Sequence, residues 1–557
     1  MTYDLRELTA TVISETYGVE ITPIFTRPAA QHGDFSTNVA LQLAAKLNKP
    51  PREIAEAIKE VLKTRGNFLI EIAGPGFVNI TLADQELFVL AMQSTNLAKP
   101  LKNKVVVAEY SDPNPFKILH AGHLYTSLVG DAVANILQVA GAKVHRVNFG
   151  GDVGLHVAKS MWSIVKDLGG EFPEKLHDIP NDQKLEWVSQ LYVKGNQAYE
   201  DDPQAKQEII EINKRVYQLH AQNDKDSPFA QIYWTCRQWS YDGFNTLYDR
   251  LGMVPFEKYY PESATLEIGT KTVKEGQKKN VFHESDGAVV FMGEHKGLHT
   301  RVFINSEGLP TYETKDLGLA LTKWQYYKYD QSIIITDKSQ QEYLKVVMEA
   351  AKAFNSEAAE RTRHLAHGQI KLVGGVKMSS RRGNILRADD VLEAAFMAGK
   401  QTAVGNEPAI VLGAVRYSFL RSRLGSDIIY DPAESVSMDG NSGPYLQYAL
   451  VRARSILRKA GDLKSETTVK ELDKLERGLA RALSRYPEEF AIALTEYSPH
   501  HIANYLFELA VIFNRFYEQS RVIGHERSAV RVSLVNAYEQ TLAHGLALLG
   551  MPQPESM

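Results

Sequence analysis

The sequence contains a single cysteine, Cys236, among 557 residues. One cysteine cannot form an internal disulfide, and it cannot build a zinc site that needs several thiolates. We expect Cys236 to be a small buried residue. A fold held by disulfides and a cysteine-rich metal centre are therefore both excluded.

Long apolar segments are also absent. No run approaches the roughly 20 apolar residues that span a bilayer, and residues 1–6 do not combine a basic region with an apolar core. Neither export nor membrane insertion is indicated, so we expect a cytoplasmic protein. The chain has no internal repeat and no low-complexity tract. Its 44% of hydrophobic residues is enough for large cores, and its length indicates a few domains.

Neither sign of charge is in large excess, because the formal net charge is −4. The cations nevertheless cluster in three segments, 371–387, 414–423 and 452–459. Nucleic-acid binding depends on where cations gather and not on their total. A basic track on a mildly acidic protein is therefore compatible with this composition.

The most informative segment begins with the apolar run 104–110, which is typical of a strand buried on both faces of a parallel sheet. Pro113 and Pro115 then favour a turn. Apolar residues between Leu124 and Val139 recur at helical spacing. A second strand, over 143–149, completes a predicted β-α-β unit.

His120 and His123 lie in the first turn of that predicted helix. Backbone N–H groups there lack helical partners and the helix dipole is positive, so a polyphosphate is well placed. Gly122 would let a nucleotide approach the backbone closely. A His-x-Gly-His pattern is expected by chance in roughly 3% of chains of this length, so alone it is a weak signal.

A second segment, 373–384, strengthens this interpretation. It has glycines on both sides and carries Lys377, Arg381 and Arg382. Alone, such a loop is typical either of a basic clamp or of a solvated hairpin tip. The two segments in this order predict a phosphate-binding site.

Residues 120–123 and 377–381 resemble the two signature motifs of class I aminoacyl-tRNA synthetases, and the surrounding sequence resembles the arginyl-tRNA synthetases. Class I synthetases that rely on cysteine-rich zinc knuckles are disfavoured by the single cysteine. The resemblance spans the chain. Further blocks similar to that family lie at 33–38, 73–79, 109–117, 151–154, 308–316, 414–417, 443–448 and 549–557.

Three domains are expected. Strands alternate with helices over 101–400, which predicts an α/β fold with a doubly wound parallel sheet, Rossmann-like and of class I type. We expect a strand around 301–305 in the second half of this nucleotide fold, and a helical insertion at about 170–250 between the two halves. Residues 1–100 predict an α+β domain, with a helical pattern over 37–64 and a strand-loop-strand over 68–82. Residues 401–557 predict an all-α bundle.

The resemblance implies ATP-dependent ligation of L-arginine to tRNA(Arg) through an arginyl-adenylate, with release of AMP and pyrophosphate. Such chemistry needs positioning and cations more than acid-base groups. Mg²⁺ is expected on the phosphates, but no carboxylate cluster identifies its ligands, so no residue is assigned to a metal. The resemblance assigns catalysis to His120, His123, Lys377 and Lys117, and ATP binding to His120, Gly122, His123, Lys377, Met378, Ser379 and Arg381.

The charge of the amino-acid side chain indicates which residues should bind it. A guanidinium presents forked donors that suit carboxylates in two-point geometry, so acidic residues are wanted near the pocket. Such a site rejects neutral analogues strongly, and no editing domain is then required. The resemblance assigns arginine binding to Glu109, Ser111, Asn114, Tyr312, Asp316 and Gln340.

For tRNA the resemblance implies that the N-terminal domain holds the D-loop and the C-terminal bundle the anticodon. The matching residues are Phe77, Asn79, Tyr445, Tyr448 and Met557. A monomer is expected, with tRNA(Arg), L-arginine and ATP as partners and no membrane contact. The chain departs from the family pattern at Tyr125, Val153 and His156, all near the predicted pocket.

Three alternatives stay open. The first is a class I synthetase of another specificity, and the second is a small-molecule adenylyltransferase with the same histidine helix. The third is a catalytically silent paralogue that binds tRNA as a regulator. The two flanking domains argue against the second, and intact His120, His123 and Lys377 disfavour the third.

Overall fold

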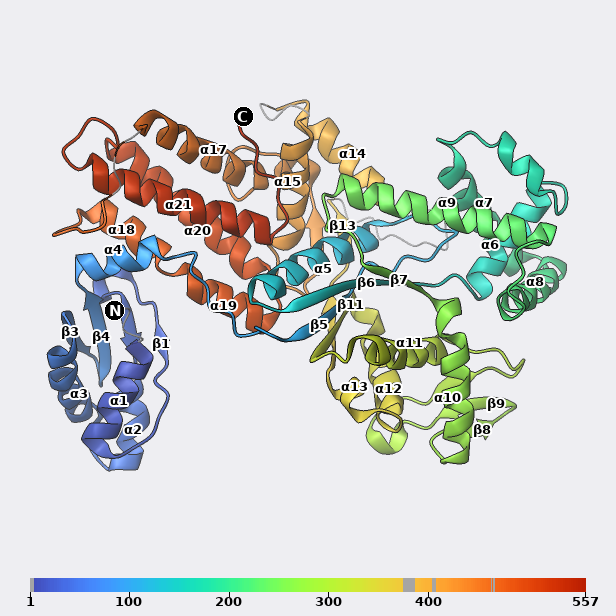
Figure 1. Cartoon of the computed structure of the whole chain (residues 1–557), viewed down its shortest axis with the longest axis horizontal. Coiled ribbons are helices and arrows are strands. Elements are labelled where there is room, and N and C mark those ends of the chain that lie inside the picture. Colours follow the sequence, from blue (N-terminus) through green and yellow to red (C-terminus); the bar gives the residue numbers. More distant parts are fainter. Residues whose placement is uncertain (1–4, 374–385, 403–406, 462, 464–465) are drawn as a thin grey trace. The chain divides into compact units, whose positions relative to one another are not determined.

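The computed structural model describes residues 5–373, 386–402, 407–461, 463 and 466–557. These residues form two compact units, each drawn from distant parts of the chain (Figure 1). The first comprises the chain up to residue 97 together with 449–489 and 505–544. The second comprises 98–448, 490–504 and 545–557.

The first unit contains an antiparallel four-stranded sheet in which β3 and β4 form the predicted strand-loop-strand. The helical pattern over 37–64 is two helices, because Asn48 adopts a left-handed conformation (φ 49°) and Pro51 starts a new helix. In spatial order the strands are β1 (Phe25–Thr26), β2 (Phe35–Thr37), β4 (Phe77–Leu82) and β3 (Phe68–Ala73). The helices nearest in sequence are α1 (Leu5–Tyr17), α2 (Val39–Leu47), α3 (Pro51–Arg65) and α4 (Asp84–Met92).

Helices from the last third of the chain complete this unit. Arg477, on α18 (Lys474–Leu483), donates to Asp34 at 2.6 Å and also pairs with Asp84. Arg27 pairs with Glu488 at 2.7 Å. Four further helices each contribute residues to both units: α17 (Gly443–Ala460), α19 (Tyr486–Glu496), α20 (His500–Gln519) and α21 (Ser528–Leu548).

The second unit is built on a five-stranded parallel sheet, which confirms the predicted fold class. The predicted β-α-β unit is β5, α5 (Ala121–Val139) and β6, and α5 covers one face of the sheet while α11 (Tyr312–Tyr327) lies on the other (Figure 1). In spatial order the strands are β12 (Thr362–His367), β11 (Gln331–Asp337), β5 (Val105–Glu109), β6 (Lys143–Gly150) and β7 (Lys258–Pro261).

The strand order places a topological switch point between β5 and β11. The chain runs outward from β5 through β6 to β7 and then returns to β11 and β12 on the other side. In open parallel sheets, ligands bind outside the carboxyl ends of the strands at such a point. The fold therefore predicts where the site lies before any side chain is considered.

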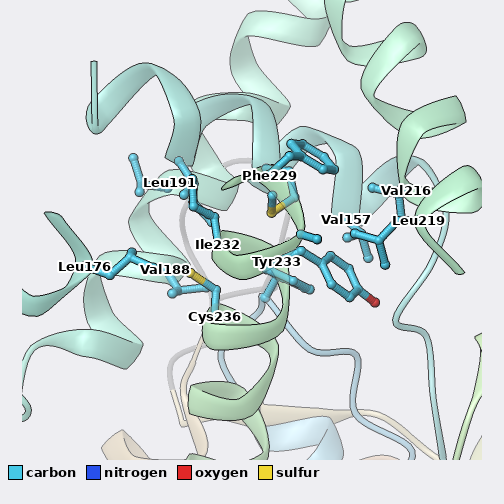
Figure 2. Packing of buried hydrophobic residues seen from close by; sticks show 14 of the residues in the cluster. Val157, Leu176, Val188, Leu191, Val216, Leu219, Phe229, Ile232, Tyr233 and Cys236 are labelled. Carbon is cyan, nitrogen blue, oxygen red and sulfur yellow. The ribbon is translucent and has the colours of Figure 1, made fainter. Parts of the chain in front are cut away.

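The predicted insertion is helical and has its own core. It comprises α7 (Lys184–Asp201), α8 (Pro203–Ala221) and α9 (Pro228–Arg250), which pack with α6 (Leu155–Asp167). Asp202 and Ser227 cap α8 and α9, each followed by a proline at the first helical position. Figure 2 shows part of the buried cluster, with Val188 and Leu191 of α7 beside Ile232 and Tyr233 of α9.

The strand expected around 301–305 was placed in the wrong sheet. It is β10 (Arg301–Ile304), and it pairs antiparallel with β9 (Ala288–Phe291), which in turn pairs with β8 (His283–Ser285). Asp286 and Gly287, both at positive φ, form the turn between β8 and β9, and the short connection of residues 292–300, with Gly297 at φ 70°, returns β10 antiparallel to β9. A parallel crossover would need a longer connection. The remaining helices of the unit are α10 (Leu266–Lys278), α12 (Gln341–Lys352), α13 (Ser356–Glu360), α14 (Ala388–Gly399), α15 (Pro408–Leu420) and α16 (Pro432–Ser435). Two short strands, β13 (Ile370–Leu372) and β14 (Ile428–Tyr430), pair in parallel.

Arg416 of α15 joins three distant segments of this unit. It is fully buried, and its guanidinium donates at 3.0 Å to Asp131 of α5 and at 3.0 Å to the Leu549 carbonyl. It also donates to the Leu251 carbonyl at 2.7 Å. Gly550 follows at φ 64°, where a Cβ atom would lie 2.0 Å from Arg416 Nη1, so only glycine fits.

We expect Arg416→Met to lower the free energy of unfolding by about 3–5 kcal/mol, because it leaves the buried Asp131 carboxylate without its partner. Urea denaturation measures this change. Lys214→Met removes an exposed pair with Glu211 and should leave the free energy of unfolding nearly unchanged. If both variants lost the same small amount of unfolding free energy, the buried pair of Arg416 and Asp131 would not be important for stability.

Within the described residues, no helix is both long enough and apolar enough to cross a membrane.

Candidate active site

A cavity of about 760 Å³ lies at the carboxyl ends of the parallel strands, at the switch point. Glu109, Asp337 and His367 are the last residues of β5, β11 and β12, and all three line it. His120 and His123 line it from the start of α5. The predicted histidines and strand-end acid therefore share one cavity.

The two histidines cap their own helix. His120 Nδ1 accepts from the Gly122 N–H at 3.1 Å, and His123 Nδ1 accepts from the His120 N–H at 3.3 Å. The rings stack with their centroids 3.8 Å apart. The backbone at this point is held by Leu386 and Ala388, through the bonds Ala121 N to Leu386 O and Ala388 N to Leu119 O, both 2.9 Å.

This arrangement determines what the imidazoles can donate. Burial, with Lys117 next in effect, lowers the pKa of His120 to about 4, and burial with the neighbouring His120 holds the pKa of His123 well below its usual value. Both rings are therefore neutral at pH 7. Because each Nδ1 accepts a backbone proton, each Nε2 carries the ring proton and can donate to an anionic oxygen.

Two of the acids in the cavity already have buried lysine partners. Glu109 pairs with Lys323 of α11, and Glu262 pairs with Lys315 of the same helix. Glu262 opens a short 3₁₀ helix, η3 (Glu262–Thr265), directly after β7. Each pair is internally neutralised, so these two acids add little net charge to the cavity.

Asp316 differs from them because no cation of the described chain forms an ion pair with it. Its carboxylate accepts a hydrogen bond from Tyr343. Burial raises its pKa to about 7, and the neighbouring Glu109 raises it too. Burial likewise holds the pKa of Asp112, which also lines the cavity, well above its ordinary value. The cavity therefore has an unmet requirement for positive charge.

The remaining predicted arginine contacts line the same cavity. Asn114 Oδ1 accepts from the Gly151 N–H at 2.8 Å, and Ser111 Oγ lies 2.7 Å from the Tyr248 hydroxyl. Tyr312 is 49% exposed and Gln340 is exposed, so both side chains are accessible to a ligand. All six residues assigned to arginine border one space.

Other predicted residues lie elsewhere. Lys377, Met378, Ser379 and Arg381 lie outside the described residues. In the first unit, Phe77 is exposed at the start of β4, whereas the buried Asn79 accepts from Ser36 Oγ at 2.7 Å. Tyr445 and Tyr448 belong to α17, and Tyr448 and Met557 are exposed.

Sequence reasoning missed several residues of the cavity. Glu262 directly follows β7, and His367 is the last residue of β12. Polar residues at the carboxyl ends of parallel strands are candidates for a site, so both could have been found if β7 and β12 had been predicted. His367 contacts Thr126 of α5 through Nε2, while its Nδ1 lies 2.8 Å from the Gly368 carbonyl oxygen. Asp337 follows the apolar run 332–336, so its place at a strand end could have been predicted in the same way. Arg301 and Tyr343 gave no motif signal.

The departures from the family pattern have structural roles. Tyr125 is buried edge-on against His367, with ring centroids 4.8 Å apart, and Val153 is buried in the core of the insertion. His156 Nε2 lies 2.6 Å from the Gly151 carbonyl oxygen and its Nδ1 lies 3.2 Å from the Tyr312 hydroxyl. His156 thus acts on the cavity through residues that border it.

No cluster of three or more His, Cys, Asp or Glu side chains suited to a metal ion occurs in the part of the chain that the structure describes.

Comparison with known proteins places these features in one family. The model described as "tRNA synthetases class I (R), catalytic domain" matches residues 86–425. "DALR anticodon binding domain" matches 446–557, and "Arginyl tRNA synthetase N terminal domain" matches 4–82.

Similar full-length proteins agree with these matches. The arginine–tRNA ligase of Flavobacterium psychrophilum is 29% identical, with 98% of each chain covered. That of Clostridium perfringens is 29% identical, with 100% of each covered. The solved arginyl-tRNA synthetase of Thermus thermophilus aligns over 100% of both chains with a TM-score of 0.78 and 25% identity.

Proposed function

The chain belongs to the class I arginyl-tRNA synthetases, and we propose on this premise that it ligates L-arginine to tRNA(Arg) in an ATP-dependent reaction. The arginine carboxylate attacks the α-phosphorus of ATP, the bond to the departing pyrophosphate breaks, and the arginyl group then passes to a terminal hydroxyl of the tRNA while AMP leaves. The observation that carries the proposal is the cavity lined both by neutral histidines and by Asp316, with which no cation of the described residues forms an ion pair.

His120 and His123 serve the triphosphate in this proposal. Their Nε2–H groups donate to phosphate oxygens at a helix start, where the helix dipole also favours negative charge. Preorganised donors of this kind stabilise the transition state because they need no reorientation as charge moves. Gly122 leaves room for the ligand, and Lys117 supplies a cation close to these donors.

Asp316 serves the guanidinium. A forked cation would supply the charge that the cavity lacks and would pair with a carboxylate in two-point geometry. Burial raises the pKa of Asp316, as do Glu109 and Glu262 although each has a lysine partner, and a cation beside Asp316 would offset these effects. Asn114, Ser111, Tyr312 and Gln340 complete the proposed arginine contacts.

The other assignments rest on the family. They include ATP contacts by Lys377, Met378, Ser379 and Arg381, with magnesium on the phosphates, where it would offset their negative charge. They also include domain limits at 1–100, 101–400 and 401–557, and tRNA contacts by Phe77, Asn79, Tyr445, Tyr448 and Met557. A monomer acting in the cytoplasm is proposed as well. The three separate family matches support the assignment of ATP and arginine to the catalytic domain and of tRNA contacts to the flanking domains.

Aminoacylation tests the proposal directly. The purified protein, with ATP, magnesium and tRNA(Arg), should charge the tRNA with labelled arginine and not with labelled lysine, the other cationic amino acid. Charging with lysine or another amino acid would point to a synthetase of different specificity. No charging, with tRNA still bound, would favour a silent paralogue.

A further inference from the structure

Lys117 lies three residues before His120, and its ammonium faces an aromatic ring from the insertion. Its Nζ is 4.6 Å from the ring centroid of Tyr192, which belongs to α7. Within the described ranges, no carboxylate forms an ion pair with Lys117. Lys117 is not among the residues that line the cavity, but it lies close enough to lower the pKa of His120, which does line it. The contact therefore joins a predicted catalytic residue to a segment about 75 residues further along the chain.

The inserted helices also fix the backbone next to Lys117. Phe116 is buried in the core of the insertion, with its ring centroid 5.4 Å from that of Tyr233. Its N–H donates at 2.9 Å to Ser240 Oγ of α9. Phe116 adopts φ 65°, a conformation that this packing and hydrogen bond hold in place.

The helix that carries Tyr192 is equally well held. Val188 and Leu191 of α7 are buried in the same cluster as Tyr233 (Figure 2). The ring therefore approaches Lys117 from a fixed element and not from a flexible loop. Both the backbone and the side chain of residues 116–117 are thus positioned by the insertion.

An aromatic ring and a carboxylate hold a lysine in different ways. A carboxylate would accept N–H groups and would neutralise the charge, as Glu109 does for Lys323. The face of a ring attracts the ammonium through its quadrupole but leaves the charge in place. An ammonium held in this way keeps donors for an anionic ligand such as a phosphate.

We propose that Tyr192 is a positioning residue for arginine activation, because its ring holds the Lys117 ammonium oriented and available for ATP phosphate. This inference rests on the proposed function and gives the inserted segment a part in the first step of the reaction.

The electrostatic surroundings of Lys117 make the contact measurable. Burial lowers the pKa of Lys117 to about 8, Lys159 of α6 lowers it further, and Glu262 of η3 raises it. His120, His123 and His156 also face it, and all three have lowered pKa values. Lys117 is therefore charged below about pH 8 and loses its charge as the pH rises through that value. Loss of the ring should lower this pKa, because the charged form loses its partner.

The experiment compares Tyr192→Leu with Tyr192→Phe in arginine-dependent pyrophosphate exchange with tRNA(Arg) present. Tyr192→Leu should lower kcat/KM for ATP by about 10-fold, leave KM for arginine unchanged, and shift the alkaline limb of the pH profile to lower pH. Tyr192→Phe keeps the ring face and should restore most of the activity and the wild-type alkaline limb.

Two further variants separate positioning from general stability. Tyr199→Leu removes a similar ring from the same helix, 4.1 Å from Lys159 Nζ, and should leave kcat/KM for ATP within about twofold. Lys117→Met should cost more than Tyr192→Leu, and combining the two should cost no more than Lys117→Met alone.

Additive losses in the double variant, or equal losses in the Tyr192 and Tyr199 leucine variants, would overturn the inference. So would a Tyr192→Leu protein that matches wild type. These outcomes are distinct from failure of the proposed function, in which the wild-type protein itself shows no arginine-dependent exchange.

Discussion

Asp316→Asn should reduce kcat/KM for arginine by about 10²–10³-fold while leaving KM for ATP nearly unchanged. Loss of one partner of a desolvated ion pair costs roughly 2–5 kcal/mol, and Asp316 is a buried cavity acid with which no described cation forms an ion pair. Arginine-dependent pyrophosphate exchange at varied arginine and ATP measures both constants.

The same substitution should stabilise the protein when arginine is absent. The pKa of Asp316 is raised from an ordinary 3.8 to about 7, so its ionisation opposes folding as the pH rises between those values, and the penalty is complete above about 7. Asp316→Asn removes this penalty. Its melting temperature should exceed that of wild type at pH 8 and should match it near pH 4.

Bound arginine should reverse the order of the two melting temperatures at pH 8. Saturating arginine should raise the melting temperature of wild type at pH 8, because it binds the folded state only, and should have little effect on Asp316→Asn. Glu109→Gln is the contrasting variant, since it leaves Lys323 buried without its partner and should destabilise the protein by about 3–5 kcal/mol. A destabilised Asp316→Asn would contradict the view that its charge exists to bind ligand.

His120→Ala and His123→Ala should each lower kcat for arginine activation by about 10²–10³-fold, the usual loss when one preorganised donor to a developing anion is removed. The affinity for tRNA should change by no more than a few fold, because neither side chain lies in the segments proposed to hold tRNA. Pre-steady-state adenylate formation and tRNA binding by filter retention measure the two effects.

The geometry offers a matched control for these variants. His120 also caps its helix, so His120→Ala loses about 1 kcal/mol of stability in addition. Asn is a good cap, and His120→Asn should keep the stability of wild type while its activity falls. Since the pKa of His120 is about 4, kcat at saturating arginine and ATP should show no histidine titration between pH 5.5 and 8, whereas the ionisation of Asp316 near pH 7 affects kcat/KM for arginine. A histidine-like limb near pH 6.5 would contradict the neutral tautomer assigned here.

Much of this site could be predicted from local sequence. The β5-α5-β6 unit follows from an apolar run, a turn with two prolines and a helical period, and these place His120 and His123 at a helix start without any long-range information. Asp316 also needed only its motif and its place near the start of a helix. In such cases a short stretch of chain determines both the conformation and the position of the side chain.

The rest depends on contacts that sequence patterns do not encode. β7 has four residues and ends in Pro261, and β12 has apolar residues only at Leu365 and Ala366, so neither gave the apolar run that revealed β5. Glu262 and His367 were missed with them. The buried pair of Glu109 and Lys323 joins residues 214 apart in the sequence. From the sequence alone Glu109 looks like an acid at a strand end that is available to a ligand, but in the structure its charge is paired with Lys323.

Citrulline provides the most direct test of the central claim, because it has the shape of arginine but a neutral ureido group in place of the guanidinium. Pyrophosphate exchange with tRNA(Arg) should be strong with arginine and lower by at least about 10³-fold in kcat/KM with citrulline, since Asp316 would be left without a cation. Comparable exchange with both amino acids would show that the acids of this cavity do not select a guanidinium, and would contradict the account.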